Sequence, residues 1–144
     1  MAAERQASVV WQGDLMNGSG TIEEVGSGAF GPLDITWASR AEESNGRTSP
    51  EELIAAAWAS CFAMSLSLGL AKAGNPPEKL ETSATVTFQP GQGIIKGALT
   101  VRGTVPSLDE AGFAEAANVA KENCPVSKAL AGIPDVSLDA QLAS

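Results

Sequence analysis

The chain has 144 residues, which is enough for a single domain, spanning residues 1–144, that buries roughly two thirds of its unfolded surface. Its 17 acidic and 9 basic residues give a formal net charge of −8, so nucleic acid and anionic membranes are disfavoured as partners. It contains no histidine, which excludes histidine triads, histidine general bases and histidine-ligated zinc.

The first elements expected along the chain are short strands. Ser8–Gly13 and Thr21–Val25 flank an Asn-Gly-Ser-Gly turn signal, which predicts a hairpin. Leu33–Ala38 alternates apolar and polar residues, which is typical of a half-buried strand, and we expect Arg40 at the end of this strand. The polar segment Ala41–Thr48 then reads as a loop that leads to a helix.

A long uncharged helix is the central element of the sequence. Ser49 is a natural N-cap, Pro50 suits the first helical position, and Glu52 completes a capping box. Leu53–Leu70 contains no charged residue and is apolar all round, so we expect burial on nearly every side. About 18 such residues also reach the threshold for a membrane span. Several serines, many alanines and the lack of basic clusters at the ends favour a core helix instead, against which a second helix can pack closely.

The second half of the chain alternates strands and helices. Glycine and prolines at 74–77 end the central helix. The patterns then predict a hairpin from Thr82–Phe88 and residues 95–105, a helix Leu108–Asn123 with a capping box from Ser107 and Glu110, a short helix after Pro125, and a final strand. The fold class expected is therefore α+β, with antiparallel sheet and helices packed against it.

The two cysteines carry the most informative chemistry. Considered alone, Cys61 and Cys124 are each more typical of small core residues than of functional thiols. However, Cys124 immediately precedes Pro125, so it is expected at a helix N-terminus, where a thiolate is favoured. The N-terminal segment lacks the apolar core of a signal peptide, so we expect a cytoplasmic protein with reduced thiols.

Two charged residues complete a plausible set for peroxide chemistry. A thiolate attacks a peroxide, an arginine stabilises the negative charge, and a carboxylate holds the arginine by bidentate hydrogen bonds. A second thiol then captures the sulfenic acid as a disulfide. Arg40 and Glu51 fit these roles, since Glu51 stands in the first helical turn but is not needed for the capping box. Arg47 is the alternative arginine near the helix start.

The strings TSPEELIAAA at 48–57, CFAMSL at 61–66 and NCPVS at 123–127 resemble the OsmC/Ohr family of thiol peroxidases. The resemblance extends to WQGD at 11–14, GSGT at 18–21 and the Ser39-Arg40 region, and so covers essentially the whole chain. It is greater to the OsmC branch than to the Ohr branch, because the arginine precedes the helix loop and the second motif reads CPVS.

The resemblance implies a fold, an assembly and an activity. The fold is the OsmC-like one, an intertwined homodimer whose central helices pack together between sheets, with active sites at the subunit interface. Cys61 is the implied peroxidatic cysteine and Cys124 the resolving cysteine, while Arg40 and Glu51 activate the thiolate and position the peroxide. Organic hydroperoxides are the implied substrates, with hydrogen peroxide poorer. The implied reductant is a small dithiol or a lipoylated protein, and neither a metal nor a prosthetic group is needed.

Other interpretations of the same residues stay open. Trp58 stands where related sequences often carry histidine, and we interpret it as packing or as the wall of a substrate pocket. Phe30, Phe62 and Met64 are candidates for such a wall, although residues of this kind are more often plain core. The alternative functions are a non-catalytic redox sensor or ligand-binding dimer, and a structural dimer with two inert thiols.

Overall fold

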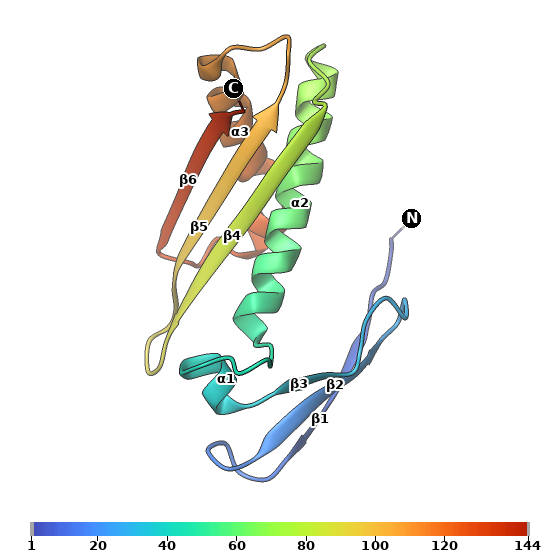
Figure 1. Cartoon of the computed structure of the whole chain (residues 1–144), viewed down its shortest axis with the longest axis vertical. Helices are drawn as coiled ribbons and strands as arrows, with labels where there is room; N and C mark the ends of the chain where they lie inside the picture. The colour runs from blue at the N-terminus through green and yellow to red at the C-terminus, as the bar shows by residue number, and fades with distance from the viewer. Residues whose placement is uncertain (1, 144) are drawn as a thin grey trace. The chain divides into compact units, whose positions relative to one another are not determined.

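The computed structural model of the chain describes residues 2–143 and has an α+β fold with two small sheets (Figure 1). The chain divides into two compact units, Met1–Leu53 and Ile54–Ser144, and each is described by itself. Helix α2 (Pro50–Lys72) begins in the first unit and continues through the second. The α+β class expected from the sequence is confirmed, whereas a single domain spanning 1–144 stays a prediction.

The first unit contains the sheet β1-β2-β3. Strands β1 (Ala7–Gln12) and β2 (Ser19–Val25) form the predicted antiparallel hairpin, and β3 (Leu33–Ile35) pairs with the other edge of β2. The third strand is shorter than expected, because helix α1 (Trp37–Ala41) starts within its predicted range.

Helix α1 begins at a capping box that the sequence analysis did not identify. Thr36 Oγ1 accepts a hydrogen bond from the N–H of Ser39 at 3.0 Å, and Ser39 Oγ accepts one from the N–H of Thr36 at 3.0 Å. These two bonds satisfy helix-terminal donors that a strand would have paired across a sheet. Arg40 therefore lies on a helix, and the expectation that it ends a strand was wrong.

The second unit is organised on the sheet β4-β5-β6. Strands β4 (Lys79–Gln89) and β5 (Gly93–Thr104) form the predicted antiparallel hairpin. Strand β6 (Asp135–Leu142) pairs with β5 in parallel, so the expectation of purely antiparallel sheets was wrong. The reason is the crossover through α3 (Glu110–Asn123) and α4 (Pro125–Ala129), which returns the chain to the end of the sheet where β5 starts.

The core of the second unit lies between this sheet and the two longer helices (Figure 1). Buried residues alternate along β5, with Leu99 and Val101 facing the helices. Helices α2 and α3 each contribute one buried row, which comprises Trp58, Phe62, Leu66 and Leu70 of α2 and Phe113, Ala117 and Ala120 of α3.

The cap of α3 differs from the one predicted. Asp109 is the N-cap, and its Oδ1 accepts from the N–H of Gly112 at 2.8 Å. Ser107 instead donates to Asn75 Oδ1 at 2.8 Å, and the Glu110 carboxylate accepts from the N–H of Leu142. The predicted Ser107–Glu110 box was wrong because the helix starts two residues later than its pattern suggests, where an aspartate is an equally good cap.

The start of α2 agrees with the sequence in part. Pro50 is its first residue, and Ser49 Oγ accepts from the N–H of Glu52 at 3.2 Å. The carboxylate of Glu52 does not complete the box, because it accepts from the hydroxyl of Thr48 at 2.8 Å. The helix ends at Lys72, just before Gly74, as predicted.

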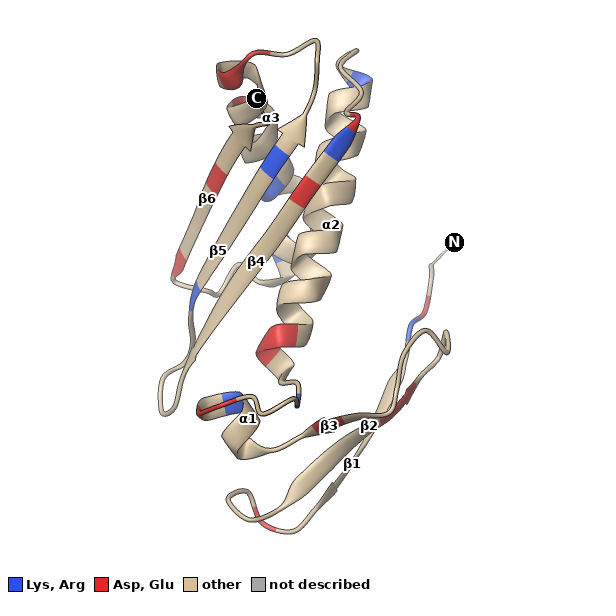
Figure 2. Cartoon of the chain, viewed as in Figure 1, with Lys and Arg blue, Asp and Glu red and all other residues tan. Residues whose placement is uncertain are grey.

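Burial of α2 within the chain is one-sided. The row from Trp58 to Leu70 is buried, whereas Met64 is 72% and Leu68 57% exposed. Burial on nearly every side was therefore wrong for the single chain, because the sheet and α3 cover only one side of the helix. Figure 2 shows that no charged residue interrupts its middle. Its length and composition suffice to cross a membrane, but core helices of soluble proteins pass the same test, and its buried row belongs to a protein core.

Candidate active site

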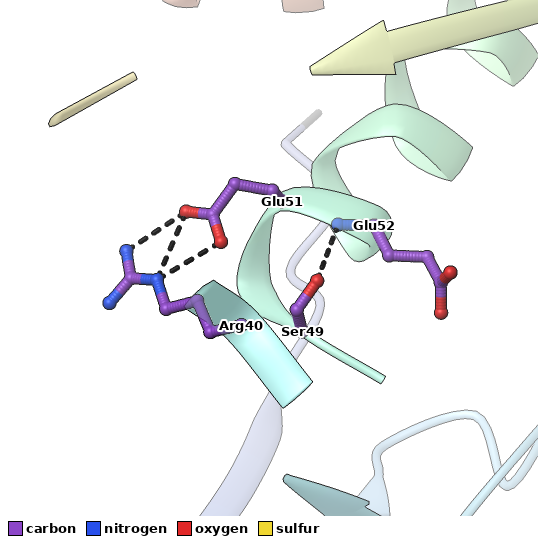
Figure 3. Close-up of polar contacts among 4 residues, drawn as sticks. All are labelled: Arg40, Ser49, Glu51 and Glu52. Carbon is purple, nitrogen blue, oxygen red and sulfur yellow. Dashed lines mark hydrogen bonds and ion pairs between the residues drawn. The ribbon is translucent and has the colours of Figure 1, made fainter. Parts of the chain in front are cut away.

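Arg40 and Glu51 form an ion pair in the first unit (Figure 3). Helix α1 carries the arginine and the first turn of α2 carries the glutamate. Arg40 Nε lies 3.0 Å from Glu51 Oε1, and Nη2 lies 2.9 Å from Oε2, so the contact is bidentate. The carboxylate is only 6% exposed and the arginine side chain 33%. This geometry fixes the plane of the guanidinium group.

A pocket of about 340 Å³ lies beside Arg40, entirely within the first unit. Its apolar walls are the side chains of Trp11, Leu15, Ile35, Trp37 and Pro50. Arg40 and Thr36 provide its polar groups. An apolar cavity with few convergent polar groups is typical of a site for a small organic molecule with one charged or polar end.

The two cysteines meet in the second unit. Cys61 lies near the middle of α2, and Cys124 lies at the junction where α3 ends and α4 begins. Both are free thiols, and their sulfur atoms are 2.9 Å apart and hydrogen-bonded. Cys124 is fully buried, whereas Cys61 is partly exposed. Residues that are 63 positions apart in sequence are thus already placed for a disulfide, whose S–S bond is about 2.05 Å long.

Helix α4 places hydrogen-bond donors around Cys124. As a thiol this N-cap residue makes no capping hydrogen bond, because sulfur is a weak acceptor. Burial raises the pKa of Cys124, but nearby hydrogen-bond donors outweigh burial. These donors are the Cys61 thiol, the N–H and hydroxyl of Ser127 and the N–H of Val126, so the pKa of Cys124 is lowered. Cys124 lies at a helix start as expected, and the direction of its pKa shift agrees with a preference for the thiolate there.

The surroundings of Cys61 act in the opposite direction. Burial raises its pKa most, and the hydrogen bond with Cys124 raises it further. The N–H of Val126 and the hydroxyl of Ser65 lower it by less. Of the two sulfurs, Cys124 therefore carries the negative charge more readily. Within this unit nothing outweighs the burial of Cys61, so any activation of its thiol has to come from another group.

Two pairs thus emerge from the four residues expected at the site. The structure brings Arg40 together with Glu51 as the sequence predicted, and it brings Cys61 together with Cys124. The catalytic roles of all four stay predictions. Arg47, the alternative arginine, is exposed.

The apolar residues considered for a pocket wall lie elsewhere. Phe62 is core, and Trp58 is core too, as one of its two interpretations held. Met64 and Phe30 are exposed and do not line the pocket beside Arg40. The sequence analysis missed Trp11 and Trp37, although both lie in segments that it had singled out. It also gave no role to Ser127, which lowers the pKa of Cys124. Its position three residues after Cys124 is the sequence signal that could have identified it as a residue of the site.

The described residues include no group of three or more Cys, Asp or Glu side chains that can hold a metal ion. The chemistry that these two pairs themselves support is thiol chemistry. A guanidinium group held by a carboxylate can stabilise an anionic leaving group, and two adjacent thiols can exchange two electrons.

Comparisons with known proteins give a consistent result. A family model described as OsmC-like protein matches residues 43–139. Peroxiredoxin OsmC of Escherichia coli is 37% identical and is covered over 100% of both chains. Organic hydroperoxide resistance protein OhrB of Bacillus subtilis is 32% identical over 74% of this chain and 79% of its own. An OsmC-like protein from Mycoplasma pneumoniae shares the fold, with a TM-score of 0.74 at 16% identity over 100% of both chains. The chain therefore belongs to the OsmC-like protein family.

Proposed function

We propose that this protein is a cysteine-based peroxidase that reduces organic hydroperoxides, and hydrogen peroxide less efficiently. The observation that carries the proposal is the pair of free thiols with sulfurs 2.9 Å apart at a helix junction. The names of its relatives support it, since one is a peroxiredoxin and another confers organic hydroperoxide resistance.

The first step of the proposed reaction takes place at Cys61. Its thiolate attacks one oxygen of the hydroperoxide, so that an S–O bond forms and the O–O bond breaks. The alkoxide leaves and takes up a proton to become an alcohol. The peroxide is reduced by two electrons, and Cys61 is oxidised to a sulfenic acid.

The second step joins the two cysteines. The thiolate of Cys124 attacks the sulfenic sulfur, so that an S–S bond forms and the S–O bond breaks. The departing hydroxide takes up a proton and leaves as water. The lowered pKa of Cys124 supports this assignment, because the resolving thiol attacks as a thiolate.

Arg40 and Glu51 are assigned to the activation of Cys61 and the positioning of the peroxide. The burial that raises the pKa of Cys61 has to be countered by a cation, and a guanidinium group also stabilises the departing alkoxide. The pocket beside Arg40 accommodates the organic group of the substrate. Its apolar walls support the proposed preference for an organic hydroperoxide over hydrogen peroxide.

A homodimer is the proposed functional unit. Glu51 and Cys61 both lie on α2, ten residues apart. An α-helix rises about 15 Å over ten residues, which is longer than the N–O distance of an ion pair. We therefore assign the Arg40–Glu51 pair of one copy to Cys61 of a second copy. The exposed apolar side of α2, with Met64 and Leu68, supports association of two chains.

An external dithiol or a lipoylated protein reduces the Cys61–Cys124 disulfide, and no bound cofactor is required for the two steps above. The proposed location is the cytoplasm, where thiols are kept reduced. The net charge of −8 supports the absence of nucleic acid and membrane partners.

Peroxide consumption with two cysteine variants tests the proposal. Native protein should consume cumene or t-butyl hydroperoxide with dithiothreitol as reductant, and Cys61→Ser should lose this activity. Cys124→Ser should undergo the first oxidation, fail to turn over, and accumulate sulfinic acid at Cys61 by mass spectrometry. Equal rates for native protein and Cys61→Ser reject the peroxidase, and normal turnover by Cys124→Ser rejects Cys124 as the resolving thiol.

A redox sensor is the second candidate, because two free thiols in contact can be oxidised to a disulfide without taking part in continuous turnover. Fast oxidation by one equivalent of peroxide, without turnover under any dithiol, identifies the sensor. Survival of both thiols after one equivalent identifies the third possibility, a structural dimer with inert cysteines.

A further inference from the structure

Ser39 joins the two segments that carry Arg40 and Glu51. It lies on α1 directly before Arg40, and it is 8% exposed although its side chain is polar. Its Oγ donates a hydrogen bond of 2.9 Å to the carbonyl oxygen of Thr48, which lies three residues before Glu51. A single hydroxyl therefore connects the helix of the arginine to the segment that leads into the helix of the glutamate.

The backbone explains what this hydroxyl does. Ile35 and Thr48 form an isolated parallel bridge, in which the N–H of Thr48 donates to the carbonyl oxygen of Asp34 at 3.1 Å. In a parallel ladder the next rung joins the N–H of Thr36 to the carbonyl oxygen of Thr48. Ser39 Oγ connects these two groups, since it accepts from the N–H of Thr36 at 3.0 Å and donates to Thr48. Because the chain turns into α1 here, a side chain continues the pairing that a longer strand supplies through its backbone.

Two carbonyl oxygens lie within reach of the one hydroxyl hydrogen of Ser39. The carbonyl oxygen of Thr36 is 3.0 Å from Ser39 Oγ, and it also accepts from the N–H of Arg40 at 3.3 Å. The carbonyl oxygen of Thr48 is slightly closer, at 2.9 Å. Since the Thr36 carbonyl has a donor without Ser39, we assign the hydroxyl hydrogen to Thr48.

We propose that Ser39 is a positioning residue that holds the guanidinium group of Arg40 on the carboxylate of Glu51. That contact joins two side chains, so its geometry depends on the spacing of the backbones that carry them (Figure 3). Residues 42–47, which connect the two segments along the chain, are all exposed, whereas the bond from Ser39 to Thr48 crosses between them directly. The inference rests on the proposed function, because Ser39 affects the reaction only through Arg40.

Hydrogen exchange of the Arg40 side chain in the full-length protein tests the proposal without peroxide. The chain has four arginines, and Arg40→Lys identifies the Nε–H signal of Arg40 by nuclear magnetic resonance. This Nε lies 3.0 Å from Glu51 Oε1, so exchange of its hydrogen with water reports opening of the pair. Ser39→Ala should raise the exchange rate by roughly fivefold, the factor that corresponds to losing one neutral hydrogen bond.

Three variants separate the Ser39 hydroxyl from general effects. Ser39→Thr keeps a hydroxyl and should keep slow exchange. Ser27→Ala is the matched control, because the Ser27 hydroxyl accepts from the N–H of Ala29 in an exposed part of the same unit. Asp109→Ala removes the N-cap of α3 and so destabilises the second unit. Neither control should change the exchange rate. Native exchange in Ser39→Ala, fast exchange in Ser39→Thr, or an equal increase in either control overturns the proposal.

Steady-state kinetics connect this geometry to the reaction. Ser39→Ala should lower kcat/KM for cumene hydroperoxide by about fivefold, and it should cause no further loss in an Arg40→Lys background, because Ser39 acts through Arg40. An equal loss in the two backgrounds overturns the proposal. An inactive native protein rejects the peroxidase but leaves the exchange measurement valid, so failure of the proposed function and failure of this inference are distinguishable.

Discussion

At the scale of single residues, the bidentate contact between Arg40 and Glu51 determines what the arginine can do. The nearly buried carboxylate holds the guanidinium group by Nε and Nη2, which fixes the direction of its positive field. A lysine keeps the charge but has no planar group to hold in this way. The orientation of the cation, and not only its charge, is therefore what the pair provides.

Arg40→Lys should lower kcat/KM for an organic hydroperoxide by about 100-fold, because it removes oriented stabilisation of the leaving oxygen. Arg47→Lys is the matched control, since Arg47 is an exposed arginine of the same loop region, and it should keep native activity. Steady-state peroxide consumption with dithiothreitol measures both. A similar loss in the two variants, or none in Arg40→Lys, contradicts the role of Arg40.

At the scale of elements, the five-residue helix α4 contributes groups that act on the pKa values of both thiols. Its first residues influence both thiols, since the N–H of Val126 lowers the pKa of Cys61 and of Cys124, and Ser127 lowers that of Cys124. The Pro125 at its start removes an N–H that would have had no partner and sets the backbone for the turn. The main role of α4 is therefore to place polar groups near the two thiols rather than to contribute buried residues to the core.

The rate of disulfide formation should rise with pH and level off below about 8.5, the ordinary pKa of a cysteine thiol. Ser127 and Val126 lower the pKa of Cys124 and remain in place once Cys61 is oxidised, so the attacking thiolate is expected to be fully formed at a lower pH than usual. Competition between dimedone trapping of the Cys61 sulfenic acid and disulfide formation measures the rate after one equivalent of peroxide. A rate that still increases above the ordinary thiol pKa contradicts this assignment.

Most elements could be predicted from the sequence because their signals are local. Pro50 and Gly74 bracket α2, and the alternation in β4 and β5 specifies their exposed and buried faces. Helix α1 could not be predicted, because its five residues continue an alternating pattern that also suits a strand. The parallel pairing of β6 was missed for another reason, since the direction of a strand depends on the crossover before it and not on its own residues.

The candidate site could be predicted in outline but not in its electrostatics. The resemblance identified Arg40, Glu51, Cys61 and Cys124, and the structure shows the two close pairs. The opposite pKa shifts of the two thiols depend on burial and on donors from α4, neither of which has a signature in sequence spacing. The hydrogen bond that Trp58 donates to Ser127 likewise joins residues 69 positions apart.

At the scale of the whole molecule, α2 has an exposed apolar side. A helix without charges over 18 positions has one face in the core and leaves Met64 and Leu68 open to water. Large apolar residues exposed on the same side of a helix are typical of an association surface. The sequence expectation of burial on nearly every side is thus fulfilled only if a second chain covers it.

Native protein should sediment as a dimer, and Met64→Lys should shift it toward the monomer, because a buried unpaired charge at an interface costs several kcal/mol. Asn118→Lys introduces the same charge at an exposed polar position of α3 and should leave the dimer intact. Analytical ultracentrifugation at several concentrations measures both. A native monomer, or a Met64→Lys variant that remains fully dimeric, rules out this interface.

The short distance between the two sulfurs also affects the stability expected for the disulfide form of the protein. In the proposed reaction, oxidation closes a covalent loop between residues 63 positions apart and joins α2 to the α3–α4 junction. Restricting the unfolded chain in this way stabilises a native fold by about 4 kcal/mol. The oxidised protein is then harder to unfold than the reduced one. In the proposed cycle, the disulfide form is therefore expected to resist proteolysis better than the dithiol form until it is reduced.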